Sequence, residues 1–157
     1  MAPFFIYLCP VEVVIEKYTK KGHGSGAGLS VFGSVIGDRL EVERHRKKGR
    51  LLAILEPGAD RVAPRCRHSG TCGGCSWQQV RYEAQLAEKQ ARVEALFEKG
   101  VEPIIPAPDL FEYRNKMEFS FSQNKAGERF LGLIIAGSRG HVLNLEECQI
   151  GRASCRE

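Results

Sequence analysis

The chain has 157 residues, 43% of them hydrophobic and 27% charged, which suits one modest globular domain or two very small ones. No stretch approaches the roughly 20 apolar residues of a membrane-spanning helix. The apolar residues 1–10 lack the features of a secretory signal and are expected to form an N-terminal extension. We therefore expect a cytoplasmic protein that does not insert into a membrane. The net charge of +4 is compatible with a polyanionic partner but does not require one.

Residues 11–64 are expected to form a small β-barrel or sandwich. Apolar and acidic residues alternate over 11–16 and again over 40–43, which is the period of a half-buried strand. Residues 51–55 supply a further apolar run before a Pro-Gly turn. The glycine-rich segment 22–28 cannot be helical and predicts a flexible turn, with a flexible linker as the alternative.

A basic run follows within this first region. Residues 44–50 contain five Lys or Arg residues and no acid. One interpretation is a solvated loop or strand edge, and the other is a surface that contacts phosphates. Under the second interpretation the RNA-binding residues are Arg44, Arg46, Lys47, Lys48 and Arg50.

Residues 77–98 have the pattern of one long helix. Apolar residues recur there at three- and four-residue steps, and Glu88 precedes Arg92 by one helical turn. Gly100 is expected to end the helix, because glycine is common just after the last helical residue. We expect the helix to bury one face and to carry no catalytic residue.

Residues 111–148 are predicted to form an antiparallel β meander. Apolar and polar residues alternate over 117–121, a turn is expected at 124–127, and strands are expected at 130–135 and 142–145. Phe119 and Phe121 are expected to pack in the core. The whole chain is therefore predicted to be mainly β with one long helix, an α+β fold.

The cysteines are the most specific feature of the sequence. Cys66, Cys72 and Cys75 form the pattern C-x5-C-G-G-C, and Cys148 lies far downstream after a predicted strand. Four thiolates can ligate a tetrahedral metal ion or the four corners of an iron–sulfur cube. Gly73 and Gly74 would permit close backbone approach and unusual dihedral angles between two ligands.

The spacing bears on the choice of metal. Structural zinc sites usually pair their ligands two and two, whereas here three are grouped and one is distant. This grouping favours a [4Fe–4S] cluster, with zinc or unligated thiols as alternatives. His68 lies inside the ligand loop and is either a substitute zinc ligand or a solvent-facing residue. Cys9 and Cys155 stand outside the pattern and have no neighbours that would activate a nucleophile.

Several of these segments resemble the RNA uracil-5-methyltransferase family, most closely its members that modify 23S ribosomal RNA. The resemblance rests on the segment 61–66 that leads to the first cysteine, on the cysteine pattern, and on a glutamine pair (Gln78 and Gln79) at the start of a helix. Tyr113-Arg114-Asn115-Lys116 is similar to a family strand, and Cys148 stands where the family has its fourth cluster ligand. Segments 22–28 and 37–42 resemble a TRAM domain, a small OB-like RNA-binding barrel. The resemblance covers residues 11–148.

The resemblance implies a domain plan and an activity. It implies a TRAM-like barrel over 11–64 and an iron–sulfur-binding central region over 65–149. Family members continue into a domain that binds S-adenosylmethionine and carries a nucleophilic Cys and a base, so this chain alone is expected to be inactive. Residues 150–157 resemble the translation of a sequencing adapter and are expected to be a non-native tail.

The resemblance also implies RNA as the partner, ribosomal in preference to transfer RNA, and we expect a monomer. Arg114 and Lys116 would contact phosphates beside Tyr113 and Phe119 as base-stacking surfaces. Two other hypotheses remain at this point. A non-enzymatic RNA-binding module could use zinc as a staple, and an electron-transfer protein could use the cluster, although the latter needs no basic barrel.

Overall fold

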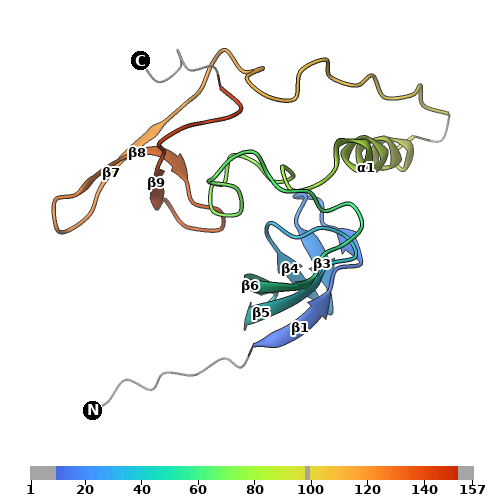
Figure 1. The fold of residues 1–157 in the computed structure, drawn as a ribbon, viewed down its shortest axis with the longest axis horizontal. Helices are drawn as coiled ribbons and strands as arrows, with labels where there is room; N and C mark the ends of the chain where they lie inside the picture. The colour runs from blue at the N-terminus through green and yellow to red at the C-terminus, as the bar shows by residue number, and fades with distance from the viewer. Residues whose placement is uncertain (1–9, 98–99, 152–157) are drawn as a thin grey trace. The chain divides into compact units, whose positions relative to one another are not determined.

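The computed structural model describes residues 10–97 and 100–151, and the chain divides after Arg61 into two compact units (Figure 1). The predicted extension lies outside the described residues except for Pro10, and so do residues 152–157 of the predicted tail and both outlying cysteines. Ile150 and Gly151, the first residues of that tail, are buried. The described chain is mainly β with a single helix, which confirms the predicted fold class.

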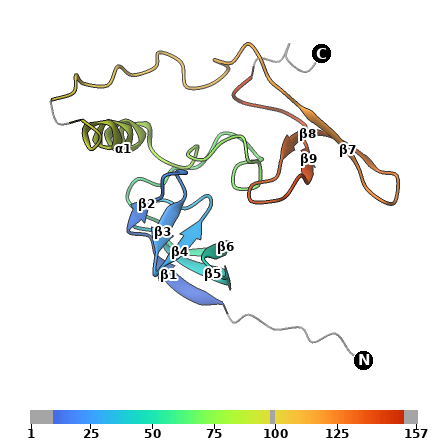
Figure 2. The same ribbon diagram turned by 180° about the vertical axis from the view of Figure 1, so that it is seen from behind.

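The first unit is a curled six-stranded sheet (Figure 2). Its strand order is β1-β5-β6-β4-β3-β2, and the pairs are antiparallel except for β4 with β6, which is parallel. The strands are β1 (Val11–Val14), β2 (Lys17–Tyr18), β3 (Gly24–Gly26), β4 (Leu29–Val31), β5 (Arg39–His45) and β6 (Lys48–Glu56). Alternate residues of β1, β4 and β5, together with Ile15 just after β1, form one apolar core made of Val13, Ile15, Leu29, Val31, Leu40 and Val42. The strands predicted from alternation are therefore confirmed.

The glycine-rich segment contains a strand, so the prediction of a flexible turn or linker is wrong at its centre. Gly24 and Gly26 are buried in β3. A Cβ on Gly26 would lie 1.8 Å from the Val14 carbonyl oxygen, and one on Gly24 would lie 2.1 Å from the Ser34 Oγ. These two positions require glycine because atoms of neighbouring residues lie too close for any side chain, not because the segment is mobile.

The second unit contains α1 (Tyr82–Glu94), which is shorter than predicted at both ends. At its start the Trp77 carbonyl accepts a bond from the Val80 amide in a turn that precedes the helix. The Glu88–Arg92 ion pair is present at 2.7 Å, as expected. No residue of α1 is buried, so the expectation of a buried face is wrong. No helix among the described residues is long and apolar enough to cross a membrane.

The meander is confirmed as an antiparallel sheet of β7 (Ser120–Gln123), β8 (Arg129–Ile134) and β9 (Val142–Asn144). Its first strand begins later than predicted. The Asn124 side chain accepts bonds from the Ala126 and Glu128 amides and so builds the predicted turn.

Phe121 is 84% exposed, so its predicted place in the core is wrong, whereas Phe119 is half-buried. Phe121 lies on β7, which is an edge strand of the sheet β7-β8-β9. Beyond Leu131, whose carbonyl accepts the Leu145 amide, the β7–β8 hairpin continues as a two-stranded ribbon among the described residues. Alternation located the strand but did not reveal that this end lacks a covering layer.

Candidate metal centre

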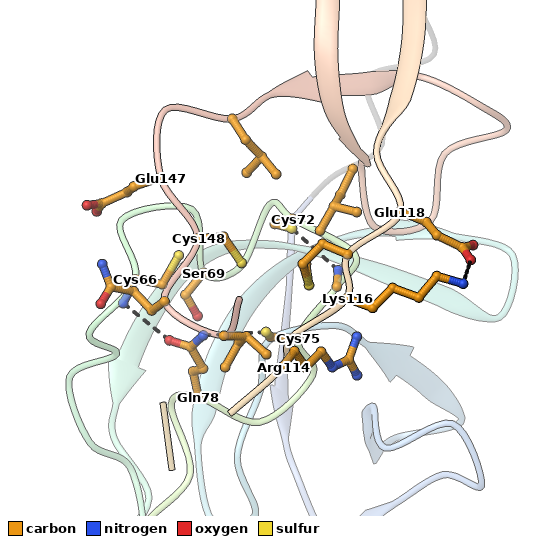
Figure 3. A pocket seen from close by; sticks show the side chains of 16 residues that line it. Cys66, Ser69, Cys72, Cys75, Gln78, Arg114, Lys116, Glu118, Glu147 and Cys148 are labelled. Atoms are coloured by element: carbon orange, nitrogen blue, oxygen red, sulfur yellow. Dashed lines mark hydrogen bonds and ion pairs between the residues drawn. The ribbon is translucent and has the colours of Figure 1, made fainter. Parts of the chain in front are cut away.

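Four cysteine side chains of the second unit line one cavity of about 310 Å³ (Figure 3). Three belong to the loop that precedes α1, and the fourth follows β9. They are Cys66, Cys72, Cys75 and Cys148, all with free thiols. Cys72 is buried and the other three are half-buried. The structure thus brings together the four residues that the sequence pattern grouped as metal ligands.

Backbone hydrogen bonds hold the cysteine loop against the end of β8. The Cys72 amide donates to the His68 carbonyl at 2.9 Å, which turns the loop between the first two cysteines. The Gly73 amide then donates to the Ile134 carbonyl at 3.0 Å, and the Ala136 amide donates to Thr71 at 2.9 Å. The loop therefore has a fixed course beside the sheet that leads to Cys148.

The two glycines between Cys72 and Cys75 permit close packing. A Cβ on Gly73 would lie 2.7 Å from the Ile134 carbonyl oxygen, and one on Gly74 would lie 2.8 Å from Leu133 Cδ1. Close approach is thus confirmed. Neither glycine has a positive φ, so the expected unusual dihedral angles are not found.

Gln78 links two of the cysteines. Its Nε2 donates to Cys75 Sγ at 3.4 Å, and its Oε1 accepts the Cys66 amide at 3.2 Å. The Gly74 amide donates to Cys72 Sγ, also at 3.4 Å. Donors directed at sulfur are the usual surroundings of thiolates that bind metal, because they stabilise the negative charge.

Burial raises the pKa of the Cys72 and Cys75 thiols above the ordinary value. The hydrogen bonds from Gly74 and Gln78 act in the opposite direction but do not outweigh burial, and the neighbouring sulfur atoms raise the pKa further. Four thiols this close would repel one another as thiolates. A bound cation reverses that balance and makes the donor set favourable, because a coordinated thiol is deprotonated.

The four cysteines do not form a preformed ligand shell. No three His, Cys, Asp or Glu side chains in the described ranges are placed to hold one metal ion. The cysteines share the lining of the 310 Å³ cavity with other residues, among them Leu133 and Leu145.

His68 does not line this cavity. Its Nε2 accepts the Glu146 amide at 3.4 Å, and the neighbouring Arg67 forms an ion pair with the Glu146 side chain. Both interactions join the cysteine loop to the segment just before Cys148. The ring is partly exposed and does not line the cavity, so the two interpretations of His68 stay predictions, and its hydrogen bond adds a link to the segment before Cys148.

Arg114 and Lys116, predicted to bind RNA, lie at the rim of the cysteine cavity (Figure 3). The Arg114 guanidinium lies 6.0 Å from the centre of the Tyr113 ring. Lys116 forms an ion pair with Glu118 at 2.9 Å, and both side chains are largely exposed. Arg114 and Lys116 therefore place charged groups beside the candidate metal centre. The sequence pattern did not predict that they would lie there.

The five basic residues of 44–50 are all exposed on the hairpin formed by β5 and β6 in the first unit. Arg44 pairs with Gly49 and His45 with Lys48, so Arg46 and Lys47 form the turn. Arg50 forms an ion pair with Glu43 at 2.6 Å. The hairpin therefore gathers the cations at one end of the sheet.

No family model matches the chain. It is 40% identical over 126 residues to an uncharacterised RNA methyltransferase of Protochlamydia amoebophila, covering 73% of this chain and 28% of that protein. An uncharacterised RNA methyltransferase of Thermotoga maritima is 31% identical over 154 residues, 88% of this chain and 34% of its own length.

A solved structure is similar as well. It is that of Pyrococcus abyssi tRNA (uracil-54, C5)-methyltransferase in complex with S-adenosyl-L-homocysteine, with a TM-score of 0.66 and 25% identity across 92% of this chain and 34% of that chain. The chain thus spans about a third of the length of the proteins it matches. On these similarities, the chain belongs to the RNA uracil-5-methyltransferase-like family of RNA methyltransferases.

Proposed function

We propose that the chain is the RNA-recognition and iron–sulfur-binding portion of an S-adenosylmethionine-dependent RNA uracil-5-methyltransferase. A [4Fe–4S] cluster would be held by Cys66, Cys72, Cys75 and Cys148. The observation that carries the proposal is the convergence of these four thiols on one cavity. The cluster would act as a structural staple, joining the cysteine loop to the chain after β9.

Three features support a cluster over a zinc ion. The donors are all thiols, grouped three and one, and the cavity has room for several atoms. The hydrogen bonds from Gln78 and Gly74 to sulfur would stabilise the thiolate charge of the bound ligands.

RNA recognition is assigned to the first unit and to the rim of the cavity. The curled sheet would be a TRAM domain whose basic hairpin follows the phosphate backbone, which confers affinity without sequence choice. Arg114 and Lys116 would add phosphate contacts at the second unit. We propose ribosomal RNA as the substrate in preference to transfer RNA. The Pyrococcus abyssi protein acts on tRNA, so both classes belong in the test.

Methyl transfer itself is assigned to the part of the relatives that this chain does not match. Uracil C5 is a poor nucleophile until a thiolate adds at C6, after which C5 takes the methyl group and a base removes its proton. In the proposal this chain positions RNA for that reaction and is inactive alone.

The first experiment is anaerobic reconstitution with iron and sulfide, followed by a visible spectrum and by iron, sulfide and zinc analysis. The variants are Cys72→Ser and, as a control outside the proposed ligand set, Cys9→Ser. A brown wild type and Cys9→Ser, with a colourless Cys72→Ser, would support the cluster. One zinc per chain and no bound iron would overturn it in favour of a zinc-stapled RNA-binding module.

The second experiment tests the basic hairpin by salt-dependent RNA binding. Arg46→Ala/Lys47→Ala removes two cations from the hairpin turn, and Lys17→Ala/Lys89→Ala removes two exposed cations outside the hairpin. For a single strand, the first variant should lower the slope of log K against log salt by about 1.4, or about 0.7 per lost contact. Equal slopes for both variants would refute the assignment. Comparing ribosomal and transfer RNA fragments tests the preferred class.

A further inference from the structure

Phe121 is an aromatic side chain on a strand that points almost entirely into solvent. It is 84% exposed, although large aromatic residues usually bury most of their surface. Its strand alternates regularly, with Ser120 and Ser122 half-buried, so the exposure of Phe121 is a property of one face of the hairpin. An aromatic ring so exposed on an ordered strand offers a flat apolar surface to a binding partner.

The neighbours of Phe121 on this face follow from the strand register. Leu131 lies directly opposite it, and the next pair toward the hairpin tip is Gln123 with Arg129. Arg129 is thus the diagonal neighbour of Phe121, roughly 7–8 Å away along such a ribbon and within reach of a long side chain. We call Phe121, Gln123, Arg129 and Leu131 the hairpin face. Figure 1 shows that β7 and β8 run on past β9 toward their connecting loop.

The charge around the hairpin face is positive. Residues 120–134, which are β7, β8 and the turn between them, contain the cations Lys125 and Arg129 and one carboxylate, Glu128, which leaves two minus one, or +1. Glu128 is hydrogen-bonded to the side chain of Asn124, within the turn. An aromatic ring in a basic setting matches a partner that offers a flat apolar surface together with negative charge.

A strand of unpaired nucleotides has both properties. Its bases stack on aromatic rings, and its phosphates bind arginine. A base-paired duplex hides its base faces and would leave Phe121 without a stacking partner. An apolar protein surface would cover the ring but would not use the surrounding cations.

We propose that the hairpin face binds single-stranded RNA, with Phe121 stacked on an unpaired base and Arg129 on an adjacent phosphate. The proposal rests on the proposed function, since it assumes that the chain binds RNA, and it adds a residue that selects unpaired over paired substrate. Gln123 has a different role, because its Nε2 donates to the Gly127 carbonyl at 3.3 Å and braces the turn.

The test is fluorescence anisotropy with a labelled single-stranded oligouridylate and a labelled RNA duplex of equal length, using the full chain. The variants are Phe121→Ala, Phe121→Trp and Ile105→Ala, the last being a control because Ile105 is 90% exposed outside the hairpin. Phe121→Ala should weaken single-strand binding by about 5- to 150-fold, the range for losing one stacked base, and leave duplex binding unchanged. Phe121→Trp should retain affinity, and Ile105→Ala should behave as wild type.

Two further readouts separate the possible failures. In Phe121→Trp the new indole should be quenched by oligouridylate beyond any change of the native Trp77, and Arg129→Ala should lower the salt slope by about 0.7. A wild type that does not bind single-stranded RNA overturns the proposed function and this proposal with it. A wild type that binds, with Phe121→Ala indistinguishable from Ile105→Ala, overturns this proposal alone. A more soluble Phe121→Ala with unchanged RNA affinity does the same and points to a protein partner.

Discussion

Arg61 donates two hydrogen bonds to the carboxylate of Asp38, from Nε to Oδ1 at 2.9 Å and from Nη2 to Oδ2 at 2.6 Å. Asp38 is completely buried and also accepts the amides of Val35 and Gly58. The Arg61 Nη2 further donates to the Gly33 carbonyl at 2.9 Å. The pair therefore fastens the last residue of the first unit to the chain between β4 and β5.

Removing one partner of this pair should strongly destabilise the first unit. Arg61→Ala leaves a buried carboxylate without its counter-charge, which costs about 3–5 kcal/mol in comparable sites. The control is Arg50→Ala, since that ion pair with Glu43 is exposed and should contribute at most about 1 kcal/mol. Urea unfolding followed by far-ultraviolet circular dichroism measures both free energies. Equal losses in the two variants would contradict the structural role of the buried pair.

Asp38 should also make stability depend on pH in the acid range. Burial alone would raise the pKa of its carboxyl group, but hydrogen bonds from Arg61, Gly58 and Val35 and the charge of Arg61 lower it below the ordinary 3.8. Between the folded and unfolded pKa values the unfolded chain binds the proton, so the stabilisation is complete above the unfolded pKa and is lost as pH falls through the folded pKa.

The expected result is a gap in Tm between the wild type and Asp38→Asn that is constant above about pH 5 and narrows as the solution is acidified. Thermal melts at a series of pH values measure it. A gap that stays the same down to the lowest accessible pH would show that the carboxylate charge contributes nothing.

Gly26 should tolerate no side chain. A Cβ there would lie 1.8 Å from the Val14 carbonyl oxygen, and a backbone atom cannot move aside as a flexible side chain can. Gly26→Ala should therefore cost at least the upper end of the about 1–3 kcal/mol typical of overpacking. Gly28→Ala is the control, because Gly28 has open space and a φ of +73°, so it should cost only the roughly 1–2 kcal/mol of left-handed backbone strain. Equal losses of unfolding free energy in Gly26→Ala and Gly28→Ala would contradict the close approach of Val14 to Gly26.

The contrast between these glycines shows what sequence alone could predict. Alternation located β1 and β5 because a half-buried strand must place apolar residues at every second position. The role of Gly24 and Gly26 could not be predicted in the same way, since it depends on Val14 and Ser34, which come close only in the folded sheet. The exposure of Phe121 was missed for a related reason: a pattern identifies a face but not what covers it.

The candidate metal centre was easier to predict than its surroundings. Three cysteines lie within ten residues, so spacing alone marks them as candidate ligands, and Cys148 is the distant fourth candidate. The hydrogen bonds of Gln78 to two cysteines could not be predicted from spacing. Its position three residues after Cys75 was nevertheless a sign that its side chain could reach the cysteine loop. Sequence reasoning treated this glutamine only as a mark of family resemblance.

Gln78 should therefore govern how firmly the proposed cluster is held. Its amide donates to Cys75 Sγ and accepts the Cys66 amide, so Gln78→Ala removes support from two ligands while leaving all four thiols in place. Loss of a comparable outer hydrogen bond weakens metal binding by about 10- to 100-fold, and iron should be lost to a chelator correspondingly faster.

The measurement is the decay of the visible absorption of the reconstituted protein in excess chelator under anaerobic conditions. Gln90→Ala is the matched control, because Gln90 is a half-buried glutamine of α1 that is hydrogen-bonded to Glu94 and does not line the cavity. Gln78→Glu adds a sharper comparison: it keeps the acceptor for the Cys66 amide but replaces the donor to sulfur with a negative charge, so it should lose iron at least as fast as Gln78→Ala. If Gln78→Ala and Gln90→Ala released iron at the same rate, the glutamine would be a bystander, and the stability of the cluster would depend on the thiols and the loop alone.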